Sequence, residues 1–499
     1  MNAFNKPSPI PLPATFNLGE TATDLEDATP RYRQLAARLQ QLIEQGAFPS
    51  GSRLPSVRML AEQEQSSPVT ALTALRYLEN LGLIEARPKS GYYVRAKSLL
   101  LKEPRNTTVT EAASEVALSK TIMRVISAAS RPNLVQLGAA SPNHVLFPVS
   151  RLRKLLTANN RTMLEAIGNY DMSMGHPELR TQIIRRYAHY SVLLKPEEII
   201  VTVGAMEALN LCLRAVTQRG DTVAVESPIY FGILQIIESL GLKALEIPTS
   251  ARDGISVDAL ELATRLKGQV KALIIMPTIQ NPLSSVMSDS DKQYVAELME
   301  ERRIPIIEDD IYGELYFEHH RPRPLKAWDK TGNVMLCSSF TKTIAPGFRI
   351  GWVAAGRWQQ EITHLKFTSS VATTSLYQIA LARFMETGGY DHHLRHLREA
   401  FQLQIRRVSE AIERYFPRGT CLSRPRGGYL LWVELPKPCN TLKLFDLALA
   451  AGIFTMPGCL FSTSERFDHH LRINCGDLWT PQIEHALKQL GELSQRCME

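Results

Sequence analysis

The sequence predicts a chain of two folded parts: a small helical unit that ends in two short strands, and a large α/β domain with a mainly parallel central sheet. Two observations lead to this prediction. Residues 30–95 contain three helical patterns followed by two short alternating runs. From residue 115 to the end, apolar strand-like runs alternate with helical segments, as in sheets covered by helices on both faces. A length of 499 residues is enough for two or three domains.

Composition and charge narrow the class of protein. With 44% hydrophobic and 21% charged residues, the chain is globular and can bury a large core. Its net charge of +7 permits nucleic-acid binding without arguing for it. The seven cysteines are odd in number and none has C-x-x-C spacing, which favours reduced thiols in a cytoplasm over disulfides or a zinc site. No apolar stretch resembles a signal peptide or reaches eighteen residues, so we expect no membrane span.

The first 95 residues predict a tail and a DNA-binding unit. Residues 1–29 carry several prolines and an acidic stretch, typical of a disordered or loosely held tail. The run RYRQLAARLQQLIEQ has helical apolar spacing. Ser56 is placed to cap a short helix over residues 57–64, and Ser67 a second one that runs from Pro68 to about Asn80. LIEA and GYYV then alternate like two strands around a turn. This order is that of a winged helix-turn-helix.

The charge of residues 30–95 is consistent with this interpretation without proving it. Nine Arg and Lys stand against five Glu, a net of +4 that suits phosphate contact and equally suits a solvated surface. A linker follows at residues 96–114. Residues 115–499 form the predicted α/β domain.

Chemistry-bearing residues follow the predicted strands of the large domain. In open α/β sheets, ligands bind beyond the carboxyl ends of the strands. Gly204-Ala205-Met206 follows EIIVTV, Ser227-Pro228-Ile229-Tyr230 follows TVAVE, and Gln280-Asn281-Pro282 follows KALIIMP. Glu308 to Tyr312 follow IPII. CSSFTK, which contains Lys342, follows NVML, and Arg349 comes seven residues later. A lysine, an acid, aromatic rings, an amide and an arginine thus converge at one edge of the sheet.

Pyridoxal phosphate needs this set of side chains. A lysine amine forms a Schiff base with its aldehyde. An aspartate pairs with the protonated pyridine nitrogen and keeps the ring an electron sink. Tyrosine and asparagine donors hold its phenolic oxygen, and an aromatic ring stacks on its face. Arginine, hydroxyls and a helix N-terminus bind its phosphate.

Multi-residue motifs resemble two known families. Residues 115–499 resemble the fold-type I aminotransferases. The motifs that carry this resemblance are SFTKTIAPGFRIGW, D-x-x-Y at Asp309 to Tyr312, Asn281-Pro282, P-x-Y at 228, Y-x-x-x-x-G at Tyr170 to Gly175, GGYLLWVELP, PGCLFS and LRINCG. Residues 30–95 resemble the DNA-binding domain of GntR regulators through LPSVRMLA. The two joined in this order resemble the MocR subfamily of GntR-type regulators.

The resemblance implies roles for individual residues. Lys342 is the Schiff-base lysine and Asp309 the pyridinium partner. The other cofactor contacts that it implies are Tyr312 and Asn281 on the phenolic oxygen, Tyr230 on the ring face, Ser339, Arg349 and the backbone at Ala205 and Met206 on the phosphate, and Tyr170 on the phosphate of a neighbouring subunit. Arg472 in LRINCG corresponds to the arginine that binds an amino-acid carboxylate, where a guanidinium suits a planar anion. No metal ligand is implied.

The sequence departs from both families in places. Val203 and Ala205 stand where many enzymes of the fold supply a hydroxyl to the phosphate, a loss for which Ser339, Thr341 and Arg349 can compensate. Pro68 and Leu72 stand where many GntR proteins carry arginines. The remaining candidates for contacts to DNA are Arg53, Ser56, Arg58, Ser67, Thr70, Thr73, Arg87 and Lys89.

Two alternative assignments and one backbone expectation bear on the site. Asp310 is a second candidate for the pyridinium partner, although the D-x-x-Y register favours Asp309. His392 and His396 have zinc-like spacing but no third ligand, so a solvated helix face is expected. The Ser227-Pro228 and Asn281-Pro282 bonds are expected to be cis, because the fold turns sharply there.

The resulting functional prediction is a cytoplasmic, homodimeric DNA-binding regulator that holds pyridoxal phosphate. Its aminotransferase-like domain is expected to sense a small amino compound, and its partners to be an operator DNA and a second copy of the chain. The rival interpretation is a catalytically active aminotransferase with an accessory winged helix. The set of residues around Lys342 keeps residual transamination open.

Overall fold

The computed structural model describes residues 30–44, 47–48, 52–87, 90–95, 101–104, 112–131, 133–157, 161–169, 171 and 174–498. The chain divides into two compact units at residues 100 and 101. The predicted tail and most of the predicted linker lie outside the described residues. Leu101 to Pro104, which we assigned to the linker, pack with the large unit, where the Leu422 amide donates to the carbonyl of Lys102 at 2.8 Å.

The small unit is a three-helix cluster with a two-stranded wing. Its elements are α1 (Arg31–Glu44), α2 (Val57–Gln63), α3 (Pro68–Asn80), β1 (Ile84–Arg87) and β2 (Gly91–Val94), the two strands pairing antiparallel. The Ser56 hydroxyl accepts from the Met59 amide at 3.3 Å and that of Ser67 from the Thr70 amide at 3.0 Å, so both serines cap the helices as predicted. Apolar residues of all three helices and both strands form one buried core.

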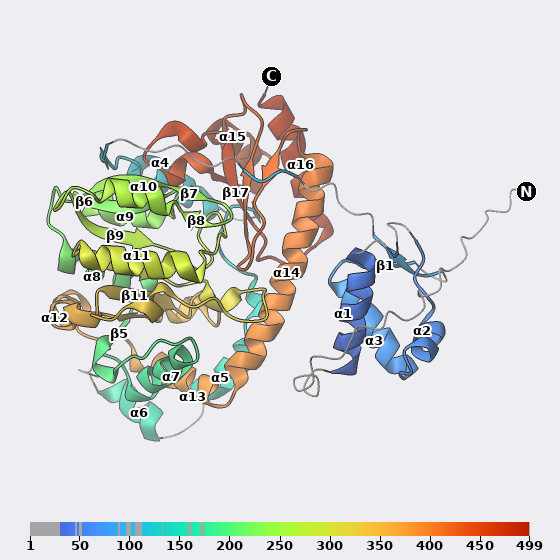
Figure 1. Ribbon diagram of the computed structural model, residues 1–499, viewed down its shortest axis with the longest axis horizontal. Coiled ribbons are helices and arrows are strands. Elements are labelled where there is room, and N and C mark those ends of the chain that lie inside the picture. Colours follow the sequence, from blue (N-terminus) through green and yellow to red (C-terminus); the bar gives the residue numbers. More distant parts are fainter. Residues whose placement is uncertain are drawn as a thin grey trace, which may run out of the picture. The chain divides into compact units, whose positions relative to one another are not determined.

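The large unit is built on a mixed, mostly parallel sheet (Figure 1). Its strands, in spatial order, are β3 (Ser114–Glu115), β7 (Lys243–Ser250), β6 (Thr222–Ser227), β9 (Val270–Ile275), β10 (Ile306–Asp309), β11 (Val334–Ser339), β12 (Gly351–Ala354) and β5 (Ile199–Thr202), with β8 (Gly254–Ile255) beside β7. The run from β7 to β11 is parallel, whereas β12 is antiparallel to both its neighbours. The predicted fold class is confirmed.

Helices cover both faces of this sheet because its strands are apolar on both. Along β6, for example, Val223 and Val225 face one core and Ala224 the other. The first core is closed by α8 (Gly204–Val216), α9 (Phe231–Ser239) and α12 (Gln359–Ser370), and the second by α10 (Val257–Ala263) and α11 (Asp289–Glu301). At the β12 and β5 end, a third cluster includes residues of α5 (Val149–Leu156), α7 (Pro177–Ala188) and α13 (Ser375–Glu386).

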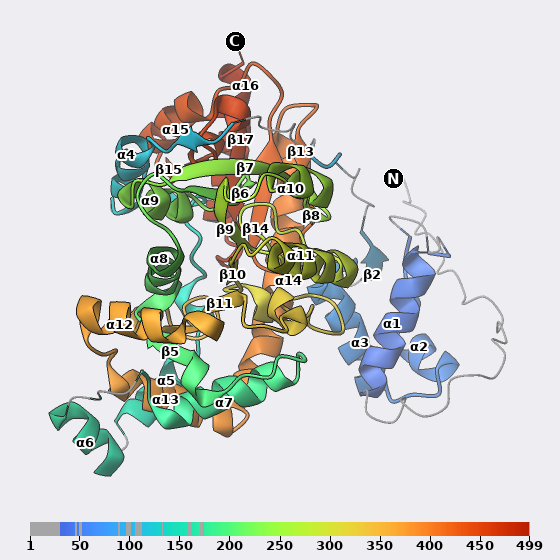
Figure 2. The same cartoon turned by 60° about the vertical axis from the view of Figure 1, so that its left-hand side comes forward.

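A C-terminal lobe carries a second sheet. Its strands, in spatial order, are β13 (Cys421–Leu422), β14 (Leu430–Glu434), β17 (His470–Asn474) and β16 (Met456–Pro457). The helix α14 (Gly389–Tyr415) runs from α13 at one end to α16 (Pro481–Arg496) at the other, and so links the two sheets (Figures 1 and 2). The remaining elements are α4 (Ser119–Ala129), α6 (Arg161–Gly168), α15 (Thr441–Ala450) and the parallel pair β4 (Val135–Gln136) and β15 (Ile453–Phe454).

Two further expectations concern the backbone and the membrane. The Ser227-Pro228 and Asn281-Pro282 bonds are cis, as predicted, and Lys437-Pro438, which we did not predict, is cis as well. Among the described residues, the helices are all too short or too polar to span a bilayer.

Candidate functional site

The carboxyl ends of the parallel strands open onto a cavity of about 140 Å³. Its lining comes from the segments that follow β5, β6, β9, β10 and β11, as the sequence pattern predicted. The lining residues are Ala140, Ala205, Met206, Leu209, Tyr230, Met276, Asn281, Asp309, Ile311, Tyr312, Thr341, Lys342 and Arg349. Eight of the ten residues that we assigned to the cofactor, all but Ser339 and Tyr170, therefore meet in one cavity.

Lys342 lies in this cavity just after β11. Its Nζ donates to the carbonyl oxygen of Ala140 at 2.7 Å. Burial, together with the cationic Arg472 and Arg349, lowers the pKa of Lys342 to about 8, while Asp309 opposes this shift. An amine with a lowered pKa is a better nucleophile at neutral pH, because a larger fraction of it is unprotonated.

Asp309 ends β10 and is 3% exposed. Burial and then the neighbouring Asp310 raise the pKa of Asp309 to about 7, against a hydrogen bond from the Ile311 amide and the charge of Lys342. The Ile311 amide donates to Oδ1 at 3.3 Å. A carboxylate held in this way lacks a strong cationic partner of its own, and a protonated nitrogen of a ligand would supply one.

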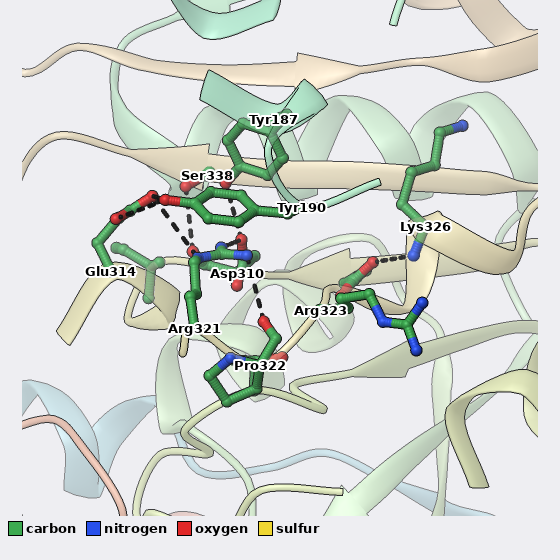
Figure 3. Close-up of polar contacts among 12 residues, drawn as sticks. Tyr187, Tyr190, Asp310, Glu314, Arg321, Pro322, Arg323, Lys326 and Ser338 are labelled. Atoms are coloured by element: carbon green, nitrogen blue, oxygen red, sulfur yellow. Dashed lines mark hydrogen bonds and ion pairs between the residues drawn. The ribbon is translucent and has the colours of Figure 1, made fainter. Parts of the chain in front are cut away.

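Asp310 belongs to a different network of buried side chains (Figure 3). Its Oδ2 accepts a hydrogen bond from the Tyr187 hydroxyl at 2.7 Å and forms an ion pair with Arg321. The Ser338 hydroxyl donates to the Asp310 carbonyl oxygen at 3.1 Å. Glu314 lies 3.6 Å from the same arginine. Asp310 is thus committed to buried protein partners, and Asp309 alone of the pair lines the cavity.

The start of α8 and the turn after β11 form a cradle suited to an anion. Gly204 has φ +76°, and a Cβ there would lie 2.5 Å from Nη2 of Arg349, so only glycine lets the guanidinium approach this helix start. Arg349 Nη1 donates to the Thr341 hydroxyl at 3.3 Å, and the Thr341 and Ser339 hydroxyls are 2.7 Å apart. Unpaired amides, hydroxyls and a guanidinium are the donors that a phosphate dianion requires.

Arg472 lies on β17 beside the cavity and is 1% exposed. Its Nη1 donates to Oδ1 of Asn281 at 3.1 Å and its Nη2 to the carbonyl oxygen of Gly138 at 2.9 Å. Its buried Nε has no hydrogen-bond partner among the described residues. Burial lowers the pKa of Arg472, with nearby tyrosines opposing the shift. A guanidinium with neutral partners and a spare donor is suited to a carboxylate ligand.

Aromatic and carbonyl groups complete the cavity. Tyr230 immediately precedes α9, and a Cβ on Gly232 would lie 2.5 Å from its ring, so the glycine leaves the space that the ring needs. The Tyr312 and Tyr429 rings are 5.7 Å apart. Sequence reasoning missed Ala140, whose carbonyl oxygen also accepts from the Tyr429 hydroxyl at 3.1 Å, because no motif marks that loop. Tyr170 lies outside the described residues.

Some of the candidate DNA-contacting residues of the small unit already bind other groups of the protein, and others are exposed to solvent. The Ser67 hydroxyl, besides its capping bond, lies 2.8 Å from that of Thr70, and the Thr73 hydroxyl donates to the carbonyl oxygen of Val69 at 2.8 Å. Arg87 pairs with the Glu85 carboxylate at 2.8 Å and lies over the Tyr93 ring. Arg58 is exposed on α2.

Two further candidates belong to the wing. Arg53 forms an isolated bridge to Tyr93, and its guanidinium packs where a side chain at Gly91 would lie. Lys89 is outside the described residues. The unit therefore offers Arg58 as its clearest free cation among our candidates, at a surface site where a phosphate can approach.

Family comparisons agree with the geometry of both units. Residues 31–94 match the family of bacterial regulatory proteins described as gntR, and residues 141–490 match aminotransferase class I and II. The chain is 39% identical to the uncharacterized HTH-type transcriptional regulator YdcR of Escherichia coli K12, over 93% of this chain and 99% of that protein. It is 37% identical to YjiR of the same organism, described in the same words, over 94% and 100%.

Solved structures extend the comparison for the large unit. The multiple substrate aminotransferase of Thermococcus profundus is 27% identical, with a TM-score of 0.69 over 76% of this chain and 95% of that one. A kynurenine aminotransferase of Pyrococcus horikoshii, solved in complex with PMP, is 26% identical with a TM-score of 0.68 over the same shares. The fold of the large unit is thus that of an aminotransferase class I and II domain. The chain belongs to the HTH-type transcriptional regulators that join a GntR domain to an aminotransferase class I and II domain.

Proposed function

We propose that this regulator holds pyridoxal 5'-phosphate in the cavity around Lys342, senses a small amino compound there, and changes its binding to operator DNA in response. The observation that carries the proposal is the joining of a DNA-binding unit to a cavity in which Lys342, Asp309 and the Arg349 cradle meet. When bound, the cofactor supplies an aldehyde that combines with amines and an electron-withdrawing ring.

The cavity residues support this cofactor through their chemistry. Lys342 provides the amine, with its lowered pKa. Asp309 provides a buried carboxylate for a protonated ring nitrogen. In this proposal Arg349, Thr341 and the first amides of α8 provide the phosphate donors and make up for the hydroxyl that Val203 and Ala205 do not supply. The remaining roles that we assign are Asn281 and Tyr312 on the phenolic oxygen, Tyr230 on the ring, Ser339 beside the phosphate through Thr341, and Tyr170 across a homodimer.

Arg472 supports an effector that carries a carboxylate as well as an amine. Its Nη atoms donate to neutral oxygens, its guanidinium lies over the Phe461 ring, and its Nε is buried without a hydrogen-bond partner among the described residues. An incoming carboxylate would exchange these contacts for charge-assisted ones. The proposed effector is therefore an amino acid or a close relative of one.

The DNA-binding side of the proposal rests on the winged helix-turn-helix. We propose that residues 30–95 and 115–499 act as separate domains and that the chain works as a homodimer, with one reader helix for each half of an operator. All seven cysteines are free thiols, which supports the cytoplasm as its location.

A catalytic aminotransferase is the second candidate, because the cavity retains both the lysine and the acid of that chemistry. One experiment separates the two. DNA sites are selected from a random library with the full chain, and the same preparation is tested for turnover of amino donors with keto-acid acceptors. Sequence-specific DNA selected by the chain, with binding that changes when an amino compound is added, supports the regulator. Turnover without any selected sequence would overturn it.

A mutation at Arg58 tests whether the surface of α2 contacts the DNA. Arg58→Ala should weaken binding to the selected DNA at every sequence and reduce the slope of log affinity against log salt by about one. Arg214→Ala, an exposed arginine of the large unit, is the matched control. Cofactor absorbance should stay unchanged in both variants. Equal salt slopes for Arg58→Ala and wild type would show that Arg58 on α2 does not contact DNA phosphates.

A further inference from the structure

A cluster of two histidines and a glutamate lies on the C-terminal lobe, apart from the cavity around Lys342. Glu434 ends β14 and His470 begins β17, and the two residues face each other across the antiparallel ladder. His469 precedes His470, and its carbonyl oxygen accepts from the Leu435 amide at 2.8 Å. The backbone thus holds the three side chains together at the point where two strands end.

The distances within this cluster are too long for hydrogen bonds. His469 Nε2 lies 3.7 Å from Oε1 of Glu434, and His470 Nε2 lies 3.9 Å from Oε2. One ligand atom of each residue lies within 4.8 Å of the others. Two ligands bound at about 2.0–2.2 Å to one tetrahedral ion are roughly 3.4 Å apart. The observed spacing therefore suits a shared ion better than direct contact.

His470 is the member whose state needs an explanation. Its side chain is 7% exposed and stacks on Trp432 with ring centroids 5.3 Å apart. Its Nδ1 is buried without a hydrogen-bond partner among the described residues, and its Nε2 is turned toward Glu434 beyond hydrogen-bond range. A buried imidazole that makes no hydrogen bond is disfavoured, because its desolvation is not compensated. An ion between Nε2 and the Glu434 carboxylate would give the imidazole one strong partner, although Nδ1 would keep none among the described residues.

We propose that Glu434, His469 and His470 bind one divalent transition-metal ion, with Zn²⁺ the best match. Two imidazole nitrogens and one carboxylate are ligands that Zn²⁺ accepts, whereas Mg²⁺ and Ca²⁺ prefer oxygen ligands throughout. The Glu434 and His469 side chains are each 16% exposed, which leaves a path for the ion and for water as a fourth ligand. Two further charges of opposite sign act on the histidines, Asp468 beside His469 and Lys437 on His470.

An ion at this site would connect two strands of the C-terminal sheet. An ion here ties the end of β14 to the start of β17, and Arg472 lies two residues further along β17, opposite Trp432. The strand pair that carries the proposed carboxylate-binding arginine is therefore the pair that the ion holds. The metal proposal itself does not depend on the proposed function, because it rests only on the three side chains.

Equilibrium dialysis of the untagged, cofactor-loaded full chain against ZnCl₂ tests the proposal, with metal measured by mass spectrometry and affinity by competition with a chromogenic chelator. Wild type should retain one Zn²⁺ at this site. His469→Ala and Glu434→Gln should each bind that ion at least tenfold more weakly. Two variants, one at the end of β14 and one in the turn before β17, protect the test against one that fails to fold, and unchanged cofactor absorbance identifies the folded ones.

The other histidine pair provides a matched control. His392 and His396 on α14 have Nε2 atoms 3.0 Å apart, and no carboxylate of the described residues joins them in a three-ligand cluster. His392→Ala should leave the ion in place. The proposal is overturned if wild type binds Zn²⁺ no more tightly than about 100 µM, if His469→Ala binds as wild type does, or if the ion is lost from His392→Ala instead. Co²⁺ in place of Zn²⁺ should give the intense visible bands of tetrahedral coordination in wild type only.

Discussion

The two units of this protein use their polar side chains in opposite ways. In the large unit, Asp309 and Arg472 are buried beside a cavity and retain unused capacity for a ligand. In the small unit, the hydroxyls of Ser67 and Thr73 are consumed by their own helix, and the cation Arg58 stands in solvent. Burying polar groups costs free energy unless partners compensate for it. A buried polar set therefore indicates a ligand, whereas an exposed one is compatible with water alone.

The largest expected effect is the loss of the lysine amine. Lys342→Ala should abolish covalent retention of pyridoxal phosphate, because no other amine lines the cavity among its described residues. Wild-type protein treated with borohydride should carry the cofactor on the peptide that contains Lys342, as peptide mass spectrometry would detect. Lys330→Ala, at a surface lysine, should behave as wild type. Label on a different lysine would contradict the assignment.

The adjacent aspartates should respond to mutation with opposite signs. Asp310→Asn breaks a buried ion pair with Arg321 and a bond from Tyr187, and should destabilise the fold by about 3–5 kcal/mol. Asp309→Asn removes a buried charge while keeping an acceptor for the Ile311 amide. It should stabilise the cofactor-free protein at pH 8 by on the order of 2–4 kcal/mol. Denaturant unfolding of cofactor-free protein measures both changes.

The gain from Asp309→Asn should depend on pH in a defined direction. The pKa of Asp309 is raised from 3.8 to about 7 on folding. Above pH 7 the carboxyl is charged in both states, and the folded state bears the full penalty of burying it. As the pH falls from 7 toward 4, the folded state takes up the proton first and the penalty disappears. A gain that instead grew at low pH would show that the charge of Asp309 is favourable in the fold.

Replacing Arg472 should weaken the binding of the effector while leaving the binding of the cofactor intact. Arg472→Ala removes charge-assisted hydrogen bonds of about 1.5–3 kcal/mol, which corresponds to a tenfold to hundredfold loss of effector affinity. Its cofactor absorbance and basal DNA binding should persist. Titration with a panel of amino acids, followed by cofactor absorbance and DNA binding, measures the response. Arg426→Ala, at a surface ion pair with Glu318, is the control. A wild-type response from Arg472→Ala would mean that the effector carries no carboxylate or binds it elsewhere.

The sequence predicted the fold and the composition of the cavity because both depend on strand ends. Apolar runs located the strands, and the residue after each run, such as Asn281 or Lys342, then had to lie at one edge of the sheet. The D-x-x-Y register already favoured Asp309 over Asp310, and the structure adds a physical reason, because Asp310 pairs with Arg321 eleven residues further along the chain. Ala140 was not predicted, because its role is that of a backbone carbonyl.

The reader surface was less predictable, because capping and reading draw on the same residue types. Ser67, Thr70 and Thr73 were candidates for base contacts, but their hydroxyls are engaged within α3. The α3 side chains that are able to contact DNA are therefore identified by their exposure and not by their polarity. The most exposed large apolar side chain of the small unit's described residues is Val69, at 73%. No sequence pattern marked it, because a valine in a helix is usually interpreted as part of a core.

Val69, Thr73 and Arg76 lie at i, i+4 and i+7 of α3 and therefore share one face. Because the Thr73 hydroxyl donates to the Val69 carbonyl oxygen, the exposed Thr73 side chain has its methyl group left to offer. The start of a reader helix is the part that meets base edges in the major groove. A valine and a threonine methyl group match the C5-methyl of thymine, the apolar feature of that groove. If this unit binds DNA as proposed, we expect its selected sites to carry thymine opposite the start of α3.

The test removes that methyl group alone. Replacing one such thymine by deoxyuridine in a selected site should weaken binding about fourfold, since burying one methyl group contributes about 0.8 kcal/mol. Val69→Ala should bind the thymine site more weakly and lose much of the difference between thymine and deoxyuridine. Val145→Ala, at an exposed valine of the large unit, should keep that difference. Equal affinity of wild type for the two sites would show that Val69 faces phosphate or solvent instead. The small unit would then read its operator through Arg76 or the wing. That result would not bear on the role proposed for the cavity of the large unit.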